Sequence, residues 1–314
     1  MARYIEQNEQ RDGVDRRGFL KCMAWAGTGL VWTASASGLL SACSLPGSAS
    51  APKVEGFSFV QLSDSHIGFT ADGVNTDVTK TLQQVVDRVN ALPQRPALVL
   101  HTGDLTHLAK PEQFDTVNQI MGTIKTGSVM YVAGEHDVIG DNGKAFRQRF
   151  TPKTPDRGWY SEDFKGVHFI GLFNAGLEDS FGVLGNDQLS WMKKDLQGVH
   201  HDTPIVVFAH VPLYAVYPQW GWYTKDSAQA MELFKPFSSV TVLNGHIHQI
   251  LHQVEGNIRF HVANSTAFPQ HHPGEDKPGA YKLPGDALLR SLGYREATVV
   301  LGKHELALID TSLA

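Results

Sequence analysis

The chain has 314 residues, a formal net charge of −5 and ordinary shares of glycine, proline and apolar residues. This composition suits one large globular domain or two small ones and excludes fibrous and largely disordered chains. The negative charge argues against stable binding to nucleic acid, which requires a basic surface.

Residues 1–43 resemble a twin-arginine export signal. A polar lead ends in Asp15-Arg16-Arg17, where Asp15 stands in the place usually held by Ser or Thr, and residues 23–40 form a mildly apolar stretch rich in Ala, Gly and Ser. The paired arginines predict recognition by the twin-arginine export machinery. This route carries folded proteins, which suits a protein that acquires metal before export.

The apolar stretch ends in Leu40-Ser41-Ala42-Cys43, which resembles a bacterial lipobox with Cys43 as the lipidated first residue of the mature protein. It predicts a place in the periplasm or cell envelope, with a lipid anchor at Cys43. Two alternatives remain open, namely a single membrane-anchoring helix and ordinary cleavage at Ala34-Ser35-Ala36. Residues 44–55, rich in Pro, Gly, Ser and Ala, predict a linker.

Residues 56–314 alternate strands with helices and predict one α/β domain with a mixed β-sheet. The apolar run 57–62 predicts the first strand. Further strands are predicted at residues 97–101, 128–132, 204–209 and 239–243, and helices at residues 74–92, 111–125 and 186–196. Hairpins are predicted from strands 160–164 and 167–173, and around Gly256-Asn257 and Gly302-Lys303.

Histidines and carboxylates follow five of these strands. They form the groups Asp64-x-His66, Gly103-Asp104, Gly134-Glu135-His136-Asp137, His210 and Gly245-His246-x-His248. Because ligands bind beyond the carboxyl ends of strands in open α/β sheets, the groups are expected to converge. If extended geometry continues past Ser63, Asp64 and His66 point to the same side.

Glycine precedes three of the groups and allows close backbone approach or a positive φ. Both cysteines, Cys22 and Cys43, precede the predicted domain, so a metal bound there must take nitrogen and oxygen ligands. The chain has fifteen histidines to supply them. The recurring groups therefore predict a metal site.

In this order and spacing, the groups resemble the motifs of the calcineurin-like metallophosphoesterase family over residues 57–248. That family carries Asp-x-His, Gly-Asp, Gly-Asn-His-Asp/Glu, a lone His and Gly-His-x-His. The resemblance implies a sandwich of mixed β-sheets flanked by helices and a centre of two metal ions. It is specific for the fold and the centre and leaves the substrate open.

The resemblance also assigns roles position by position. One metal would bind Asp64, His66, Asp104 and His248, and the other would bind Asp104, Glu135, His210 and His246, so that Asp104 is the bridge. His136 would bind no metal and would stand near the phosphate as proton donor or charge stabiliser, held by Asp137.

Mixed Asp and His ligands suit Fe, Mn, Zn or Co better than Ca or Mg. Two such ions roughly 3.5–4 Å apart can share a hydroxide and clamp a phosphoryl group for in-line attack. The implied activity is hydrolysis of a small phosphorylated substrate, with phosphodiesters favoured. The alternatives are a phosphomonoesterase or nucleotidase with the same centre, and a non-catalytic lipoprotein that binds metal or phosphate. An acid at His136 argues against the last.

Two positions bear on the branch of the family. Glu135 replaces the usual Asn, and it would bring the charge of two divalent ions with their ligands and hydroxide from about +1 to about zero. Either the metal pair differs or the site prefers a less charged phosphate. His107 stands where purple acid phosphatases have a tyrosine ligand, and His66 stands where they have glycine. The pattern therefore favours the bacterial cyclic-nucleotide phosphodiesterase-like branch.

The remaining candidates have two interpretations each. The aromatic residues Tyr214, Tyr217, Trp220, Trp222 and Tyr223 form either a stacking wall or lid over the metals or the packed core of a long loop. Asn264-Ser265-Thr266 and His271-His272 are either turn and surface residues or part of the mouth of the site. The other histidines, His168, His200, His201, His252, His261 and His304, are predicted to be structural.

Overall fold

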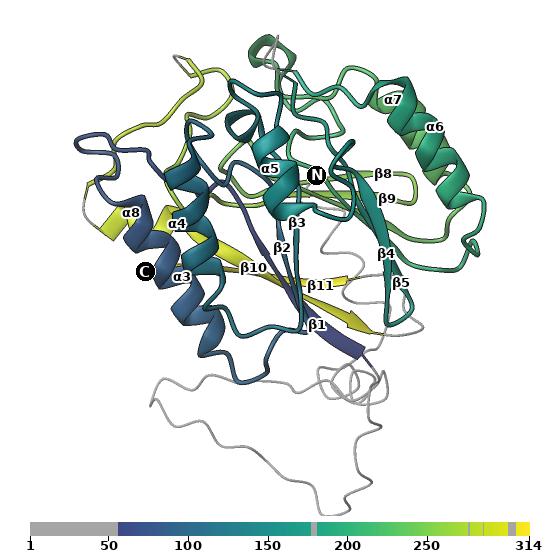
Figure 1. Cartoon of the computed structure of the whole chain (residues 1–314), viewed down its shortest axis with the longest axis horizontal. Helices are drawn as coiled ribbons and strands as arrows, with labels where there is room; N and C mark the ends of the chain where they lie inside the picture. Colours follow the sequence, from purple (N-terminus) through teal and green to yellow (C-terminus); the bar gives the residue numbers. More distant parts are fainter. Residues whose placement is uncertain (1–55, 177–180, 276, 285, 301–305) are drawn as a thin grey trace, which may run out of the picture. The chain divides into compact units, whose positions relative to one another are not determined.

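The computed structural model describes residues 56–314 except residues 177–180, 276, 285 and 301–305. The predicted export signal and linker lie outside the described residues, as do the turn at Gly302-Lys303 and His304. Within the described part, two β-sheets pack face to face and helices cover their outer faces (Figure 1).

The first sheet has five described strands in the order β11-β10-β1-β2-β3. They are β1 (Gly56–Leu62), β2 (Leu98–His101), β3 (Val129–Tyr131), β10 (Gly293–Val300) and β11 (Leu306–Ser312). Strands β1, β2 and β3 are parallel, and β10 and β11 add an antiparallel pair at the β1 edge.

The second sheet has six described strands in the order β4-β5-β6-β7-β9-β8. They are β4 (Tyr160–Phe164), β5 (Val167–Gly171), β6 (Ile205–Phe208), β7 (Val240–Asn244), β8 (Leu251–Glu255) and β9 (Ile258–Val262). The four central strands are parallel, and the edge strands β4 and β8 are antiparallel to their neighbours. The predicted mixed sheet sandwich flanked by helices is confirmed.

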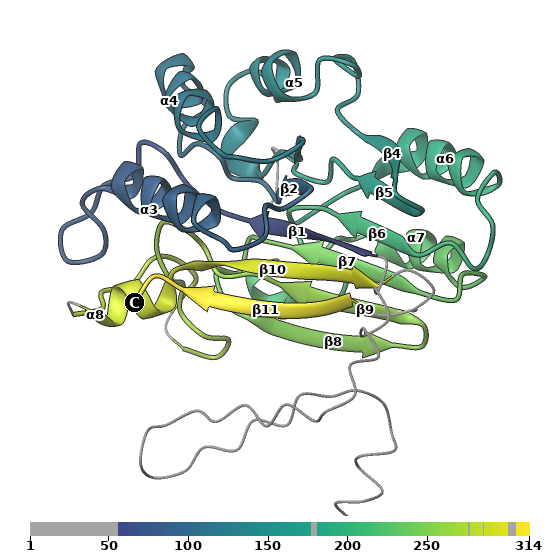
Figure 2. The same ribbon diagram turned by 90° about the horizontal axis from the view of Figure 1, so that it is seen from below.

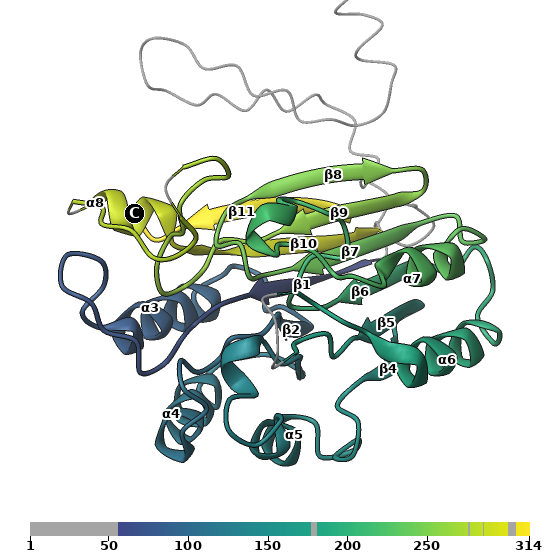
Figure 3. The ribbon, with the colours of Figure 1, turned by 90° about the horizontal axis from the view of Figure 1, so that it is seen from above.

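Helices cover both outer faces of the sandwich. The described helices are α3 (Val78–Asn90), α4 (Pro111–Met121), α5 (Lys144–Phe150), α6 (Gly185–Leu196), α7 (Ser227–Phe234) and α8 (Asp286–Ser291), with 3₁₀ turns at Glu135–Asp137 and Pro218–Trp220. Figures 2 and 3 show α3 and α4 beside the first sheet and α6 and α7 beside the second. Among the described residues, no helix has the length and apolar character needed to cross a membrane.

Strand β1 shows why the sequence forms four layers. Its side chains alternate in direction, as in any strand, and both of its faces are buried. Phe57 and Phe59 belong to the core between the two sheets, whereas Val60 and Leu62 belong to the core between the first sheet and its helices. A third core packs α6 and α7 on the second sheet. Burial on both faces fits the near-continuous apolar runs of the central strands.

The predicted hairpins at 160–173 and at Gly256-Asn257 are present. Lys165 and Gly166 have φ of 48° and 80°, as expected of the type I′ turn that joins two strands most tightly. Strands β10 and β11 pair antiparallel, in agreement with the third predicted hairpin.

Helix boundaries differ from the prediction at α3 and α4. Helix α3 begins at Val78, rather than at residue 74, because the Asp77 side chain caps it by accepting a hydrogen bond from the Lys80 amide at 2.9 Å. Helix α4 ends at Met121, before Gly122, and so is shorter than the predicted 111–125. Helices α5, α7 and α8 were not predicted.

Candidate metal centre

The candidate ligands lie in loops that directly follow five strands. Asp64 and His66 follow β1, Asp104 follows β2, Glu135 follows β3, His210 follows β6, and His246 and His248 follow β7. The five strands run parallel within their sheets: β1, β2 and β3 in the first sheet, and β6 and β7 in the second. All seven residues follow the carboxyl ends of these strands. The structure brings them together at one end of the sandwich, as the distances below show.

The loop after β1 does not stay extended, so the condition under which strand geometry would aim Asp64 and His66 to one side is not met, although the two side chains do converge. Their φ values are 52° and 41°, in the left-handed region. The Asp64 amide donates to the Gly103 carbonyl at 3.0 Å and the His66 amide to the Asp104 carbonyl at 2.9 Å. Hydrogen bonds to the β2 loop therefore hold the two side chains in place.

Asp104, His246 and His248 also have positive φ, at 51°, 70° and 56°. Such conformations cost on the order of 1–3 kcal/mol each and persist only where the surroundings fix them. Here the Asp64 carboxylate accepts the His246 amide at 3.0 Å, and Asp104 Oδ1 accepts the His136 amide at 2.9 Å. Carboxylates thus fix the backbone of neighbouring ligand loops.

Two of the glycines are sterically required. A Cβ at Gly134 would overlap Asp104 Oδ1, and a Cβ at Gly245 would overlap Asp64 Oδ2 and Ser63 Oγ. Gly103 combines a φ of 94° with close approach to the His210 ring. The expectation that these glycines allow close approach or positive φ is confirmed.

Asp64, His66 and His248 form the first ligand group. Their ligand atoms lie within 4.8 Å of one another. His248 Nε2 is 3.2 Å from Asp64 Oδ1 and 3.2 Å from His66 Nε2. All three side chains are buried. Two ring nitrogens and a carboxylate oxygen therefore face one point.

Glu135, His210 and His246 form the second ligand group. Glu135 Oε2 is 2.8 Å from His210 Nε2, and Glu135 Oε1 is 2.7 Å from His246 Nδ1. The Glu135 side chain does not turn away from the centre, although 31% of it is exposed.

Asp104 lies between the groups. Its Oδ2 is 3.4 Å from His66 Nε2 of the first group and 3.3 Å from His210 Nε2 of the second. One carboxylate oxygen thus faces both sets of ligands, as a bridging ligand must.

Hydrogen bonds fix the rings of two ligands. His210 Nδ1 lies 2.8 Å from the Thr102 carbonyl, and His248 Nδ1 lies 2.6 Å from the Phe268 carbonyl. A carbonyl can only accept, so each Nδ1 carries a hydrogen and Nε2 is the nitrogen left to bind a metal once it holds no proton. This is the arrangement that orients metal-bound histidines.

Unpaired buried atoms test whether the residues fit metal ions. His210 Nε2, both ring nitrogens of His246 and Glu135 Oε2 are buried, and within the described residues none makes a hydrogen bond of acceptable geometry. Buried polar atoms rarely stay unpaired without a functional reason. Nitrogen and oxygen atoms that crowd a common point at 2.7–2.8 Å without a well-formed hydrogen bond suit a cation, so the donor set fits two metal ions.

The two outer carboxylates are ionised. Burial would raise the pKa of Asp64, but His248 and His210 hold it at about 2. Burial also acts to raise the pKa of Glu135, yet His246 and His210 lower it well below its ordinary value. Ionised carboxylates are the form that binds metal.

The imidazoles divide into two states. Burial lowers the pKa of His66 well below its ordinary value, which keeps it neutral and able to bind metal. Burial also lowers the pKa of His210, but Asp104 and Glu135 outweigh it and raise that pKa well above normal. A metal ion bound there would displace the proton, as is usual when metal binding is coupled to ionisation.

His136 and Asp137 occupy the 3₁₀ turn after β3. His136 lines the pocket beside the ligands, and its Nδ1 lies 2.7 Å from the His107 carbonyl. The expectation that Asp137 holds His136 is wrong. The buried Asp137 carboxylate instead accepts the amides of Leu105, Thr106 and Gly134 at 2.8–3.0 Å and so joins the loops after β2 and β3.

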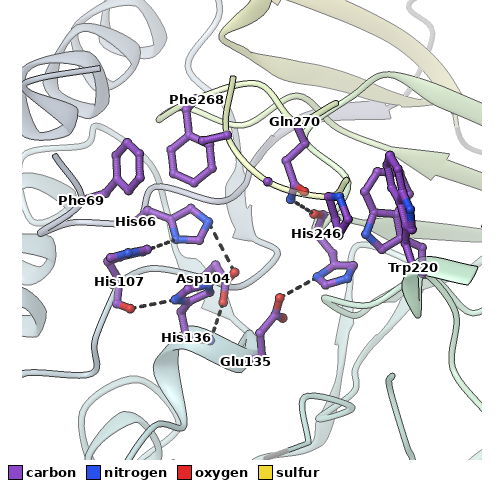
Figure 4. A pocket seen from close by; sticks show the side chains of 14 residues that line it. His66, Phe69, Asp104, His107, Glu135, His136, Trp220, His246, Phe268 and Gln270 are labelled. Atoms are coloured by element: carbon purple, nitrogen blue, oxygen red, sulfur yellow. Dashed lines mark hydrogen bonds and ion pairs between the residues drawn. The ribbon is translucent and has the colours of Figure 1, made fainter. Parts of the chain in front are cut away.

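A pocket of about 300 Å³ opens over the ligands. Figure 4 shows His66 and His107 on one side, His246 and Trp220 on the other, and Asp104 and Glu135 between them. Its remaining walls are Phe69, Trp222, Phe268, Gln270 and Pro278–Ala280. The aromatic group after His210 was expected to form either a wall of the site or the core of a long loop. Trp220 and Trp222 line the pocket and so support the wall. Trp222 is also buried among apolar neighbours.

The other sequence candidates lie elsewhere. Ser265 is buried beneath the centre, where its Oγ donates to the Asp64 carbonyl at 2.7 Å, and His272 Nδ1 lies 2.9 Å from Gln249 Oε1. Within the described chain, none of the histidines predicted to be structural lines the pocket. His168, for instance, lies between Asp163 and Asp195 at 2.7 and 2.9 Å.

Phe69, Phe268 and Gln270 were missed from the sequence. Gln270 donates to the His246 carbonyl at 2.7 Å, and Phe69 and Phe268 pack against each other with ring centroids 4.2 Å apart. A lone aromatic or glutamine in a long loop carries no local pattern, and no signal in the sequence could have identified these residues.

Comparison with curated proteins finds two kinds of phosphodiesterase. A probable cyclic nucleotide phosphodiesterase of Psychrobacter sp. is 27% identical over 224 residues, covering 66% of this chain and 64% of that protein. The 3′,5′-cyclic adenosine monophosphate phosphodiesterase of Pseudomonas aeruginosa is 26% identical, covering 66% of this chain and 75% of its own. A probable glycerophosphodiester phosphodiesterase of Arcobacter nitrofigilis is 28% identical over 49% of this chain and 56% of that protein.

Solved structures share the fold at low identity. A dimetal phosphatase from Danio rerio superposes with a TM-score of 0.57 at 12% identity, covering 82% of this chain and 99% of that one. A purple acid phosphatase from yellow lupin gives 0.59 at 16% identity, covering 83% and 52%.

The solved structures show a shared fold only, whereas a match to a family model shows membership of the family. The model of the calcineurin-like phosphoesterases matches residues 57–250, which is more than half of the chain and includes every candidate ligand. The chain therefore belongs to the calcineurin-like phosphoesterase family of metal-dependent phosphoric ester hydrolases.

Proposed function

We propose that this protein is an exported phosphodiesterase that hydrolyses small phosphodiesters at a centre of two metal ions. One observation carries the proposal: Asp104 Oδ2 lies 3.4 and 3.3 Å from the ring nitrogens of two separate ligand groups. A single shared carboxylate oxygen suits two ions held close enough to act on one phosphoryl group.

When bound, the metal pair supplies a hydroxide nucleophile and stabilises charge on the phosphoryl oxygens. Asp64, His66 and His248 would hold one ion, and Glu135, His210 and His246 the other, with Asp104 shared. The protein fixes the spacing through the loop contacts between Asp64, Asp104 and the amides of His246 and His136.

His136 is the group that acts on the substrate directly. Its Nδ1 is occupied by the His107 carbonyl, which leaves Nε2 as its donor in the pocket. Burial lowers the pKa of His136, but Asp104 and Glu135 outweigh it, so the net shift in the metal-free centre is upward. A protonated imidazole can donate to the leaving ester oxygen or stabilise the phosphoryl charge.

Glu135 favours a diester over a monoester. A third carboxylate lowers the charge of the loaded centre by about one unit relative to a centre with Asn. A phosphodiester carries one negative charge, whereas a monoester dianion carries two. Lowering the positive charge of the centre therefore weakens its attraction for the diester less than its attraction for the monoester. The aromatic walls of Trp220, Trp222 and Phe268 also offer apolar surface to a second ester group.

The relatives support this choice, because their names denote phosphodiesterases of cyclic nucleotides or glycerophosphodiesters. The two substrate classes share a phosphodiester bond and differ in the attached groups. Phosphodiester hydrolysis is accordingly the level at which the function is proposed.

Replacing Glu135 tests the charge argument. Glu135→Gln removes the charge and keeps the length, and Glu135→Asn restores the family's usual residue. At a distance of about 5 Å and an effective dielectric constant of about 20, one charge acts on another with roughly 3 kcal/mol. We therefore expect both variants to raise the ratio of monoesterase to diesterase kcat/KM about tenfold or more, measured with nitrophenyl phosphate and bis-nitrophenyl phosphate.

Metal content must be measured in the same samples. Variants that keep both ions and leave the ratio unchanged would contradict the charge argument. A parent protein that prefers the monoester would establish the phosphomonoesterase alternative, and a metal-loaded parent without activity on either ester would establish the binding-protein alternative.

Export is the second part of the proposal, and the sequence of residues 1–43 supports it. Arg16→Lys with Arg17→Lys is expected to leave the protein in the cytoplasm, whereas the control Arg11→Lys is exported as before. Cys43→Ala is expected to move the exported protein from the membrane fraction to the soluble envelope fraction. Normal export of the double variant would refute the twin-arginine route, and unchanged fractionation of Cys43→Ala would refute the lipid anchor.

A further inference from the structure

His107 has no role in either ligand group, yet it contacts the centre on two sides. Its Nδ1 lies 3.3 Å from His66 Nδ1, and its ring stacks on the His136 ring with centroids 4.7 Å apart and planes 17° apart. It lines the pocket together with both (Figure 4). These contacts place it next to one proposed metal ligand and the proposed acid.

His66 differs from His210 and His248 in the partner of its outer nitrogen. Those two rings direct Nδ1 to backbone carbonyls of Thr102 and Phe268. In the described part of the chain, the only hydrogen-bond partner of His66 Nδ1 is the imidazole nitrogen of His107. A metal-binding histidine normally donates its second N–H to an acceptor that fixes its ring, and here that acceptor is a side chain.

The pairing determines where each hydrogen lies. His66 Nε2 faces Asp104 and His248 at 3.4 and 3.2 Å, on the side of the ligand group. When Nε2 binds a metal through its lone pair, the hydrogen of His66 must lie on Nδ1. His107 Nδ1 must then accept, which leaves the hydrogen of His107 on Nε2. Among the described residues, His107 Nε2 has no hydrogen-bond partner, and the ring borders the pocket.

We propose that His107 is a positioning residue that accepts the His66 Nδ1 hydrogen and thereby presents its own Nε2–H to an anionic phosphoryl oxygen in the pocket. The first role orients a metal ligand, and the second adds a neutral donor beside His136. The inference rests on the proposed metal centre and adds to it a specific route for recognising the phosphoryl group.

Two substitutions separate the roles. In His107→Asn the side-chain oxygen can occupy the place of Nδ1 and accept from His66, but the Nε2–H is lost. In His107→Phe the ring that packs on His136 and Phe69 is kept, and both hydrogen bonds are lost. The zinc-loaded protein also allows a direct measurement, because Zn²⁺ is diamagnetic and the nitrogen chemical shifts of a histidine report which ring nitrogen carries the hydrogen.

We expect His107→Phe to bind the more weakly held metal about 10–100-fold less tightly, the usual effect of losing a partner of a ligand. His107→Asn should bind metal within about threefold of the parent. Inorganic phosphate, measured by titration of the metal-loaded proteins, should bind more weakly to both variants. In the zinc-loaded parent, nitrogen shifts should place the hydrogen of His107 on Nε2 and that of His66 on Nδ1.

Hydrogen on His107 Nδ1 would overturn the inference, and so would unchanged metal affinity in His107→Phe. Phosphate affinity equal to the parent's in both variants would overturn the second role. None of these measurements uses hydrolysis, so a parent protein that binds metal without hydrolysing any ester would refute the proposed function while the role of His107 is still tested.

Discussion

Asp104→Asn is expected to reduce phosphodiester hydrolysis to below about 1% of the parent's and to lower the metal bound per chain. The substitution removes the charge and one oxygen of the carboxylate that faces both ligand groups. The fold should survive, because an amide oxygen can still accept the His136 amide that Asp104 Oδ1 accepts now. Metal analysis, an activity assay and a thermal melt on the same preparation check the three statements.

Asp115→Asn is a matched control. Asp115 lies on α4, its side chain is 70% exposed, and its described ion pair is with Arg149 at 3.8 Å. This control should keep full metal content and activity. An Asp104→Asn protein with both ions and near-normal turnover would exclude Asp104 as the bridge.

His136→Ala is expected to keep both metals and to lose turnover by roughly a hundredfold or more, the effect of removing an acid or electrostatic stabiliser. The loss should be larger for a substrate with an alkyl leaving group than for a nitrophenyl ester, because a nitrophenolate leaves readily without a proton. His136→Gln, which keeps a donor near the position of Nε2, should recover part of the activity. Kinetics on both esters and metal analysis check these outcomes.

Loss of metal from His136→Ala would identify His136 as a ligand. The geometry makes this test necessary, since ring atoms of His136 lie within 4.8 Å of ligand atoms of Asp104 and Glu135. An equal loss on both esters would assign His136 to charge stabilisation rather than to proton donation.

The site could be located from the sequence because its parts repeat one local pattern. Each ligand stands within a few residues of the end of an apolar strand, and the carboxyl ends of parallel strands share one edge. The position of a residue after a strand and the shared edge of the sheet do not predict the backbone conformation of the loops. Asp64 and His66 adopt positive φ because the loop after β2 binds their amides, and that contact joins segments about forty residues apart.

Adjacency in sequence misled the prediction for Asp137. In the turn after β3, successive side chains point in different directions, so His136 faces the pocket and Asp137 faces the interior. Short helices were missed for a related reason. Helices α5 and α8 have seven and six residues, too few for a periodic pattern to stand out from a loop.

The crowding at Gly134 and Gly245 makes the motifs dependent on one another. Each glycine belongs to one motif, and the residues that exclude its side chain belong to another loop: Asp104 for Gly134, and Ser63 together with Asp64 for Gly245. The glycine and the carboxylate therefore form one unit divided between distant parts of the chain, and a substitution at either changes what the other position can accept. For engineering, the consequence is that a ligand loop cannot be transplanted alone; the carboxylate loop that shapes it must be moved with it.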